Sequence, residues 1–281
     1  MSTYQSGFAE INGATIFYEV KGEGRPVLLL HGYPLDSRMW DDQFEEFSKY
    51  YQVIRFDYAG CGKSSHHDED FSLVEDAKNL LLYLGVAKVE LVGLSVGGNL
   101  AMDFALAYPE MVDKLILASS GLLGWTDYSP ERQNYNKEVN ELFQKESLEE
   151  AVELMCKAWV AGPFRSIDEI NPAIIEKYAA MLSGNITREN GTGKMILPEK
   201  KTLELVGNIS VPTLIISPDI DFPDFSAISE LLHEKITGSQ LVVIPGTAHM
   251  MNMEKPLEFN QLVVDFLNRT LIRSLPQQFL K

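Results

Sequence analysis

The chain contains very little cysteine. Cys61 and Cys156 are its only two cysteines in 281 residues. Two cysteines are too few for a disulfide framework, and they lack the spacing of a metal-binding motif. We therefore expect a fold without disulfides, no metal site and no cofactor.

The chain also lacks long hydrophobic runs. No apolar segment approaches the length that a membrane span needs, and residues 1–5 carry neither the basic nor the apolar region of a secretory signal. These absences predict a cytoplasmic protein that does not have a membrane as its partner.

Positive charge is scarce. There are 24 lysine and arginine residues against 40 aspartate and glutamate residues, which gives a net charge of −16. Such a balance argues against nucleic acid or an anionic membrane surface as a partner, because both are bound through clustered positive charge. The partner that we expect is a small-molecule substrate.

Alternating strands and helices dominate both ends of the sequence. Strand patterns occur over residues 8–11, 14–20, 26–30, 52–56, 89–92, 114–118, 213–216 and 240–244. Helical patterns occur over residues 39–50, 71–84, 99–108, 225–236 and 256–271. The turn Asn12-Gly13 makes the first two strands a hairpin. The later alternation predicts an α/β fold, with a mostly parallel sheet covered by helices on both faces.

The alternation stops in the middle of the chain. Residues 121–209 show helical periodicity without strand patterns. We expect residues 1–120 and 210–281 to form the α/β core and residues 121–209 to form an inserted helical cap, or lid, over the active site. A packed subdomain without a catalytic role is the alternative.

The most informative motif is the segment Gly-Leu-Ser-Val-Gly at residues 93–97. It lies between a buried strand and a helix, where a serine flanked by glycines forms a nucleophile elbow. The tight turn exposes the serine hydroxyl, and the glycines permit close approach of the backbone. This context predicts that Ser95 is a catalytic nucleophile rather than part of an ordinary glycine-rich turn.

A serine nucleophile needs a base and an orienting acid. His249 follows the strand over residues 240–244, so it faces the same crevice as Ser95. Three aspartates follow the strand over residues 213–216. Asp224 has the position of a helix N-cap, Asp219 that of a turn residue, and Asp221 is our choice for the acid. The order Ser95, Asp221, His249 is that of an α/β-hydrolase.

Acyl transfer also needs donors for the oxyanion of the tetrahedral intermediate. One donor is the backbone N–H of Val96, directly after the nucleophile. The other is expected in the loop His-Gly-Tyr-Pro at residues 31–34, with the N–H of Tyr33 as the donor.

Taken together, these motifs resemble the α/β-hydrolase fold superfamily along nearly the whole chain. The resemblance implies an eight-stranded, mainly parallel sheet with a helical cap after the sixth strand. It implies the roles of nucleophile for Ser95, acid for Asp221 and base for His249, with Tyr33 and Val96 as the oxyanion hole. The serine at position 95 excludes relatives that open epoxides or displace halide through an aspartate.

The resemblance predicts a hydrolase of small carboxylic esters or lactones that acts through an acyl-enzyme. One alternative is a carbon–carbon bond hydrolase of ring-cleavage products, for which Arg165 and Arg188 would have to hold an acidic substrate. A second alternative is a ligand-sensing receptor of the same fold. Apolar residues are expected at the pocket, namely Leu94, Trp125, Trp159, Phe164 and Met250.

Overall fold

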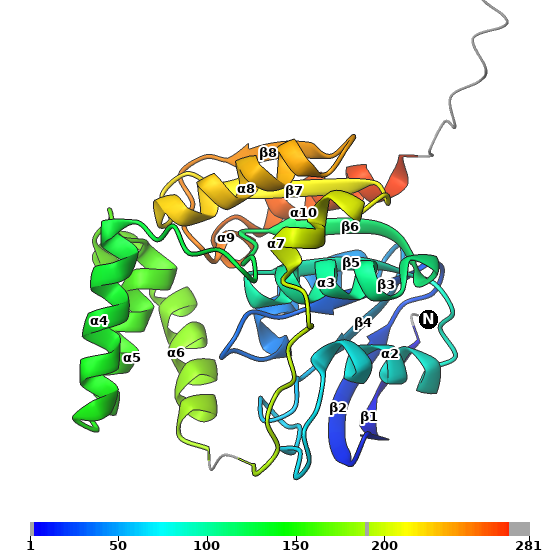
Figure 1. The fold of residues 1–281 in the computed structure, drawn as a ribbon, viewed down its shortest axis with the longest axis horizontal. Helices are drawn as coiled ribbons and strands as arrows, with labels where there is room; N and C mark the ends of the chain where they lie inside the picture. Colours follow the sequence, from blue (N-terminus) through cyan, green and yellow to red (C-terminus); the bar gives the residue numbers. More distant parts are fainter. Residues whose placement is uncertain (1–2, 189–190, 270–281) are drawn as a thin grey trace, which may run out of the picture.

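Figure 1 shows the computed structural model, which describes residues 3–188 and 191–269. Eight strands form one sheet in the order β1-β2-β4-β3-β5-β6-β7-β8. They are β1 (Tyr4–Ile11), β2 (Ala14–Lys21), β3 (Pro26–Leu30), β4 (Gln52–Phe56), β5 (Val89–Leu94), β6 (Val112–Ala118), β7 (Thr213–Pro218) and β8 (Gln240–Ile244).

The sheet is mainly parallel, which confirms the predicted fold class. β1 pairs with β2, and β2 with β4, in the antiparallel sense. The other pairs, from β4–β3 to β7–β8, are all parallel. The antiparallel hairpin turns at Asn12 and Gly13, which both have positive φ angles. This is the backbone conformation that a tight hairpin turn of this kind requires.

Ten α-helices accompany the sheet in the described part of the chain. They are α1 (Asp41–Phe47), α2 (Leu73–Tyr83), α3 (Val96–Ala107), α4 (Pro130–Gln144), α5 (Leu148–Cys156), α6 (Pro172–Ile186), α7 (Thr202–Leu205), α8 (Pro223–Lys235), α9 (Met251–Glu254) and α10 (Pro256–Asn268). The helix predicted over 39–50 is a 3-10 turn, Ser37–Trp40, followed by α1. The helix predicted over 256–271 ends at Asn268, and residues 270 and 271 lie outside the described residues.

The core is divided between the two faces of the sheet. Along β3, Val27 and Leu29 face one hydrophobic cluster, and Leu28 and Leu30 face the other. This is the alternation of a strand that is buried on both sides. Side chains of α1 and α10 belong to the first cluster, those of α2 and α3 belong to the second, and α8 contributes to both.

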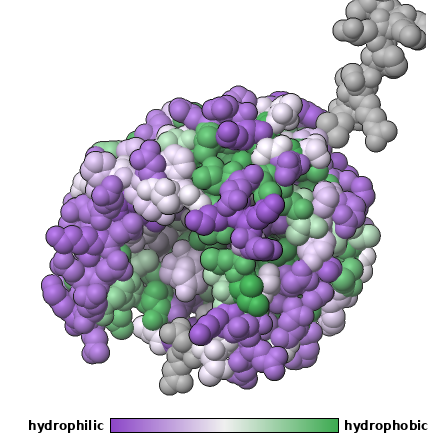
Figure 2. All heavy atoms as spheres, viewed as in Figure 1, coloured by the Kyte–Doolittle hydropathy of each residue, from purple (hydrophilic) through white to green (hydrophobic). Residues whose placement is uncertain are grey.

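Between β6 and β7 the chain forms α4, α5, α6 and α7. Figure 1 shows α4, α5 and α6 standing together to the left of the sheet, while α7 lies beside α3. Hydrophilic side chains cover the left edge of the molecule, where α4 and α5 lie (Figure 2). Buried apolar residues of α4, α5 and α6 join the same cluster as β3 and α1, so this block packs onto the core.

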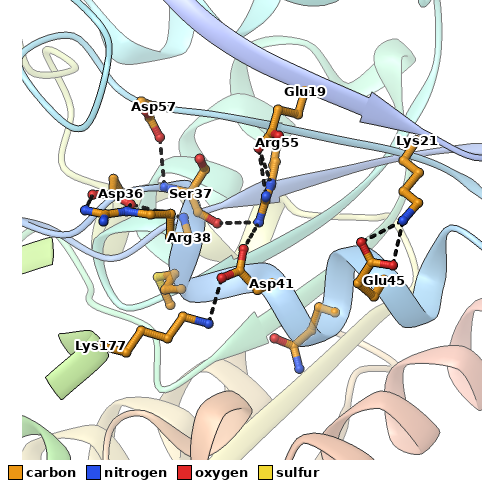
Figure 3. Close-up of polar contacts among 12 residues, drawn as sticks. Glu19, Lys21, Asp36, Ser37, Arg38, Asp41, Glu45, Arg55, Asp57 and Lys177 are labelled. Atoms are coloured by element: carbon orange, nitrogen blue, oxygen red, sulfur yellow. Dashed lines mark hydrogen bonds and ion pairs between the residues drawn. The ribbon is translucent and has the colours of Figure 1, made fainter. Parts of the chain in front are cut away.

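A polar network fastens the block to the core near the loop after β3 (Figure 3). Arg55 of β4 pairs with Glu19 at 2.7 Å and with Asp41 at 2.6 Å. The second oxygen of Asp41 lies 2.9 Å from Lys177 of α6. Because the Arg55 side chain is nearly buried, we expect its pair with Glu19 to be screened less by salt than a surface ion pair.

Within residues 3–188 and 191–269, no helix combines the length and the apolar composition that crossing a membrane requires. The segments that follow the carboxyl ends of β3, β5, β7 and β8 carry the predicted site residues. Parallel strands bring these ends to one edge of the sheet, where such folds bind their ligands.

Candidate active site

Ser95 stands at the turn between β5 and α3 in a strained backbone conformation. Its φ is +58° and its ψ is −119°, a combination that side-chain-bearing residues rarely adopt. The amide of Ser95 donates to the carbonyl of Ala118, and its own carbonyl accepts from the amides of Gly98 and Gly121. These bonds to β6 and α3 hold the turn, so the predicted nucleophile elbow is present as backbone geometry.

The positions of Gly93 and Gly97 leave no room for a side chain. A Cβ on Gly93 would lie 2.2 Å from the carbonyl oxygen of Gly97, and one on Gly97 would lie 2.1 Å from that of Leu30. Both obstacles are backbone atoms, which cannot move aside as a flexible side chain would. The motif therefore lets α3 begin directly against β3 and β5.

His249 and Asp221 form a buried pair beside this turn. Nδ1 of His249 lies 2.6 Å from Oδ2 of Asp221, and both side chains are almost inaccessible to solvent. The other carboxylate oxygen, Oδ1, accepts from the amide of Phe222 at 2.8 Å. Hydrogen bonding to the carboxylate places the proton on Nδ1 and leaves Nε2 of His249 free to accept one.

Of the three competing aspartates, only Asp221 contacts His249. Asp219 accepts from the amides of Gly246 and Thr247 and so supports the loop that carries the histidine. Asp224 is not the N-cap that its position predicted. Helix α8 begins at Pro223, two residues before the predicted start at residue 225, so Asp224 lies within its first turn. The Asp224 carboxylate accepts from the amide and hydroxyl of Ser129.

Ser95 and His249 line one small cavity. Its walls also include Tyr33, Leu94, Trp159, Tyr178 and Met250, and its volume is about 20 Å³. In the described residues the two side chains share this cavity without a direct hydrogen bond between them. Catalytic hydrogen bonds are often long until substrate binds. A space of this size holds about one water molecule, so a substrate requires the walls to part.

The apolar residues expected at the pocket divide into two groups. Leu94, Trp159 and Met250 line the cavity, whereas Trp125 and Phe164 are not among its walls. Phe164 instead faces solvent, with 60% of its surface exposed. Trp159 reaches the cavity from a π-helical turn, Lys157–Ala161, a conformation that is frequent at functional sites.

The loop after β3 is held by a buried histidine. Nε2 of His31 accepts from the amide of Tyr58 at 3.1 Å, which leaves Nδ1 to donate to the carbonyl of Gly32 at 2.9 Å. The ring stacks on Tyr58 at 3.6 Å. Burial lowers the pKa of His31, so the ring stays neutral and keeps both roles.

This loop and the start of α3 present two backbone amides to the same region. Val96 is the first residue of α3, where amides have no partner within the helix. In the described part of the chain, neither the amide of Val96 nor that of Tyr33 donates a hydrogen bond to another protein group. A Cβ on Gly32 would lie only 3.5 Å from the Cβ of Ser95, which shows how near the loop comes to the elbow.

Comparison with known proteins decides the family. A family model described as the alpha/beta hydrolase fold matches residues 25–256. The chain belongs to this family.

Two known proteins resemble this α/β-hydrolase in sequence, and a third resembles it in fold alone. A protein of Azorhizobium caulinodans named as a carbamate hydrolase is 28% identical over 92% of this chain and 97% of its own length. A thermophilic esterase of Thermogutta terrifontis, solved with malate bound, is 27% identical with a TM-score of 0.77, and the match covers 94% and 98% of the two chains. The enol-lactonase of Burkholderia xenovorans LB400 shares the fold at 21% identity and a TM-score of 0.76, with coverage of 94% and 100%.

One residue of the hydrolase site escaped the sequence analysis. Ser119 follows β6 and places its hydroxyl 2.8 Å from Oδ2 of Asp221 and 3.0 Å from Nδ1 of His249. One signal in the sequence was usable, because Ser119 directly follows a parallel strand just as Ser95 does.

Proposed function

We propose that this α/β-hydrolase cleaves small carboxylic esters or lactones through an acyl-enzyme on Ser95. The observation that carries the proposal is the convergence on one cavity of the strained Ser95 turn and the buried pair of His249 and Asp221. The unengaged amides of Tyr33 and Val96 complete the set that acyl transfer needs.

In the proposed mechanism, Nε2 of His249 takes the proton of the Ser95 hydroxyl as its oxygen attacks the acyl carbon. The negative charge that develops on the carbonyl oxygen is stabilised by the N–H groups of Tyr33 and Val96. The imidazolium then gives its proton to the leaving alcohol oxygen, and water hydrolyses the acyl-enzyme by the reverse sequence. Throughout, Asp221 keeps the proton of His249 on Nδ1.

We further propose that residues 121–209 act as a cap over the site. Trp159 and Tyr178 come from this segment and form part of the cavity wall beside Ser95 and His249. Because the cavity holds only about one water molecule, these walls must move to admit an ester. Movement of a cap commonly excludes water from the reaction once substrate is bound.

The relatives favour hydrolysis at a carbonyl carbon. The Thermogutta terrifontis protein is an esterase, and the Azorhizobium caulinodans protein is named for hydrolysis of a carbamate, which is also a carbonyl substrate. Both reactions pass through a tetrahedral intermediate that needs the same nucleophile, base and oxyanion donors.

The arginines considered for a carbon–carbon hydrolase are engaged elsewhere. Arg165 pairs with Glu254 at 2.8 Å, and Arg188 donates to the carbonyls of Gly62 and Ser64. Neither side chain is among the walls of the cavity that contains Ser95. Ester or lactone hydrolysis is therefore the function that the site supports best.

The deciding experiment measures release of p-nitrophenol from the acetate and butyrate esters. We expect turnover by the wild type and loss of turnover in Ser95→Ala. Ser147→Ala should keep full turnover, because the Ser147 hydroxyl makes no capping hydrogen bond at the start of α5. Release that survives in Ser95→Ala would refute the serine mechanism. Negligible release by the wild type would favour the carbon–carbon hydrolase or the receptor instead.

A further inference from the structure

Arg132 of α4 lies in a box of aromatic rings next to the candidate site. Its guanidinium carbon is 4.4 Å from the centre of the Trp159 ring. It is also 5.5 Å from the ring of Tyr135, 5.4 Å from that of Phe222 and 5.8 Å from that of Phe225. Faces of aromatic rings attract a cation, which explains how a positive charge is tolerated at this place.

The guanidinium nevertheless has no anionic or hydrogen-bonding partner among the described residues. Its Nε and Nη1 atoms are buried and make no hydrogen bond. The two nearest carboxylates are already engaged, Asp224 by Ser129 and Asp221 by His249. Burial lowers the pKa of Arg132, because removing the cation from water is costly. A buried charge normally has a partner, so this one is prepared for a ligand.

A single layer of rings separates this cation from the candidate base. Trp159, which contacts the guanidinium, has its ring centre 4.6 Å from that of His249. Phe225, on the same side, is 4.4 Å from the His249 ring. Trp159 also lines the cavity of Ser95 and stands in the π-helical turn, so its side chain forms the partition between the cavity and Arg132.

The charge of the whole chain makes this local cation significant. With a net charge of −16, the protein repels anions on average. A neutral ester needs no cation for binding, whereas an anionic one needs a positive group within reach of the nucleophile. Arg165 and Arg188 are bound to protein groups, which leaves Arg132 as the arginine placed for this role.

We propose that Arg132 binds a carboxylate on the substrate, so that the enzyme prefers esters or lactones of short dicarboxylic acids. This inference rests on the proposed function, because it assumes that the acyl carbon is held at Ser95. The far carboxylate of such a substrate passes Trp159 and pairs with the guanidinium, whose planar fork matches two carboxylate oxygens.

The test compares two esters of similar length that differ in charge. Mono-p-nitrophenyl glutarate ends in a carboxylate, and p-nitrophenyl hexanoate ends in a methyl group. We expect Arg132→Met to lower kcat/KM for the glutarate ester about ten- to hundred-fold relative to the hexanoate ester. Arg132→Lys should retain part of the preference, because it keeps the charge but not the fork.

The matched control is Lys137→Met, which removes an exposed cation from the same helix. Lys137→Met should leave the ratio of the two kcat/KM values unchanged. If the loss of any positive charge lowered this ratio, Lys137→Met would lower it as Arg132→Met does. An equal ratio in the wild type and in Arg132→Met would overturn the proposal.

A second measurement covers the case in which Arg132→Met does not fold. Glutarate should inhibit hexanoate ester hydrolysis by the wild type competitively, and neutral glutaramide should not. Equal inhibition by the two compounds would overturn the assignment. If the wild type hydrolyses neither ester, the proposed function fails, and the arginine is then tested by melting temperature. Glutarate should raise the melting temperature of the wild type, raise that of Arg132→Lys less, and leave that of Arg132→Met unchanged. An equal rise in all three proteins would refute the carboxylate site.

Discussion

The hydroxyl of Ser119 lies 2.8 Å from Oδ2 of Asp221, the same oxygen that Nδ1 of His249 approaches to 2.6 Å. Ser119 is completely buried and holds a positive φ of 41°, which places its side chain between the carboxylate and the imidazole. Its hydroxyl donates to Asp221, and its oxygen can share the Nδ1 proton of His249 at 3.0 Å. The histidine is thereby oriented by two residues rather than one.

Removing this hydroxyl should slow the reaction without changing substrate binding. In Ser119→Ala, Asp221 loses a hydrogen bond to a charged group, which is worth about 1.5–3 kcal/mol. We expect kcat to fall about ten- to hundred-fold with an unchanged KM, since Ser119 contacts the proposed base and acid and does not line the cavity. Steady-state kinetics with p-nitrophenyl butyrate measure both parameters.

The neighbouring Ser120 provides the control for this prediction. Its hydroxyl donates to the carbonyl of Gly121 and does not contact Asp221 or His249. Ser120→Ala should therefore keep a kcat near that of the wild type. A loss of similar size in both variants would mean that Ser119 acts through local packing and not by orienting the histidine.

The choice between the aspartates of the β7 loop can be tested in the same way. Asp221→Asn should lower kcat by a factor on the order of 10⁴, because an amide can favour the wrong tautomer of His249. Asp219→Asn removes a charge but keeps a side-chain oxygen that can accept from the amides of Gly246 and Thr247, so we expect a much smaller effect. A loss of less than tenfold in Asp221→Asn would move the role of acid to Asp219.

Much of this architecture was predictable because its signals are local. The eight strands, the hairpin at Asn12 and the sheet class follow from hydrophobic runs and turn residues that lie close together in the sequence. Ser95 was found because strand, glycines and helix lie within a few residues of it. The positions of Asp221 and His249 followed from a general rule, that ligands bind at the carboxyl ends of parallel strands.

What escaped prediction depends on contacts between distant segments. Ser119 meets Asp221 across 102 positions of sequence, and serine is a common residue after a strand. Arg132 is recognisable only because Trp159, Phe222 and Phe225 surround it in space. The predicted start of α8 was wrong for a similar reason. The side chain of Asp224 accepts a hydrogen bond from Ser129, which lies before α4 and far away in the sequence.

The glycines of the elbow should be far less replaceable than an exposed glycine in a helix. Gly97→Ala would place a Cβ 2.1 Å from the Leu30 carbonyl, and relieving that clash should cost about 1–3 kcal/mol or more. In Gly184→Ala of α6 the new Cβ would have no atom within 4 Å. This substitution should raise the free energy of unfolding by about 0.5–1 kcal/mol, because alanine has the higher helix propensity. Urea unfolding of both variants measures the change, and destabilisation by Gly184→Ala would contradict this account.

The buried His31 should make the fold sensitive to mild acid. Burial lowers the pKa of His31 in the folded protein, and this outweighs the opposing effects of the hydrogen bond to the Gly32 carbonyl and of the nearby Asp57 and Asp36. In the unfolded chain His31 binds a proton below its ordinary pKa of about 6.5. Between this pH and the lower folded-state pKa, the unfolded state therefore holds more protons than the folded state. Stability from His31 is complete above about pH 6.5 and is lost as the pH falls through the folded-state pKa.

Substitution of His31 separates its contribution from that of other titrating groups. In His31→Gln the side chain can still accept from the amide of Tyr58 but cannot bind a proton. The variant should be less stable at pH 7.5, because it loses the stacked ring, yet its melting temperature should fall less between pH 7.5 and pH 5.5. Calorimetry at the two pH values gives both numbers. An equal fall in the two proteins would show that His31 does not set the acid sensitivity, and that its neutral ring is not what holds the loop of Tyr33 in place.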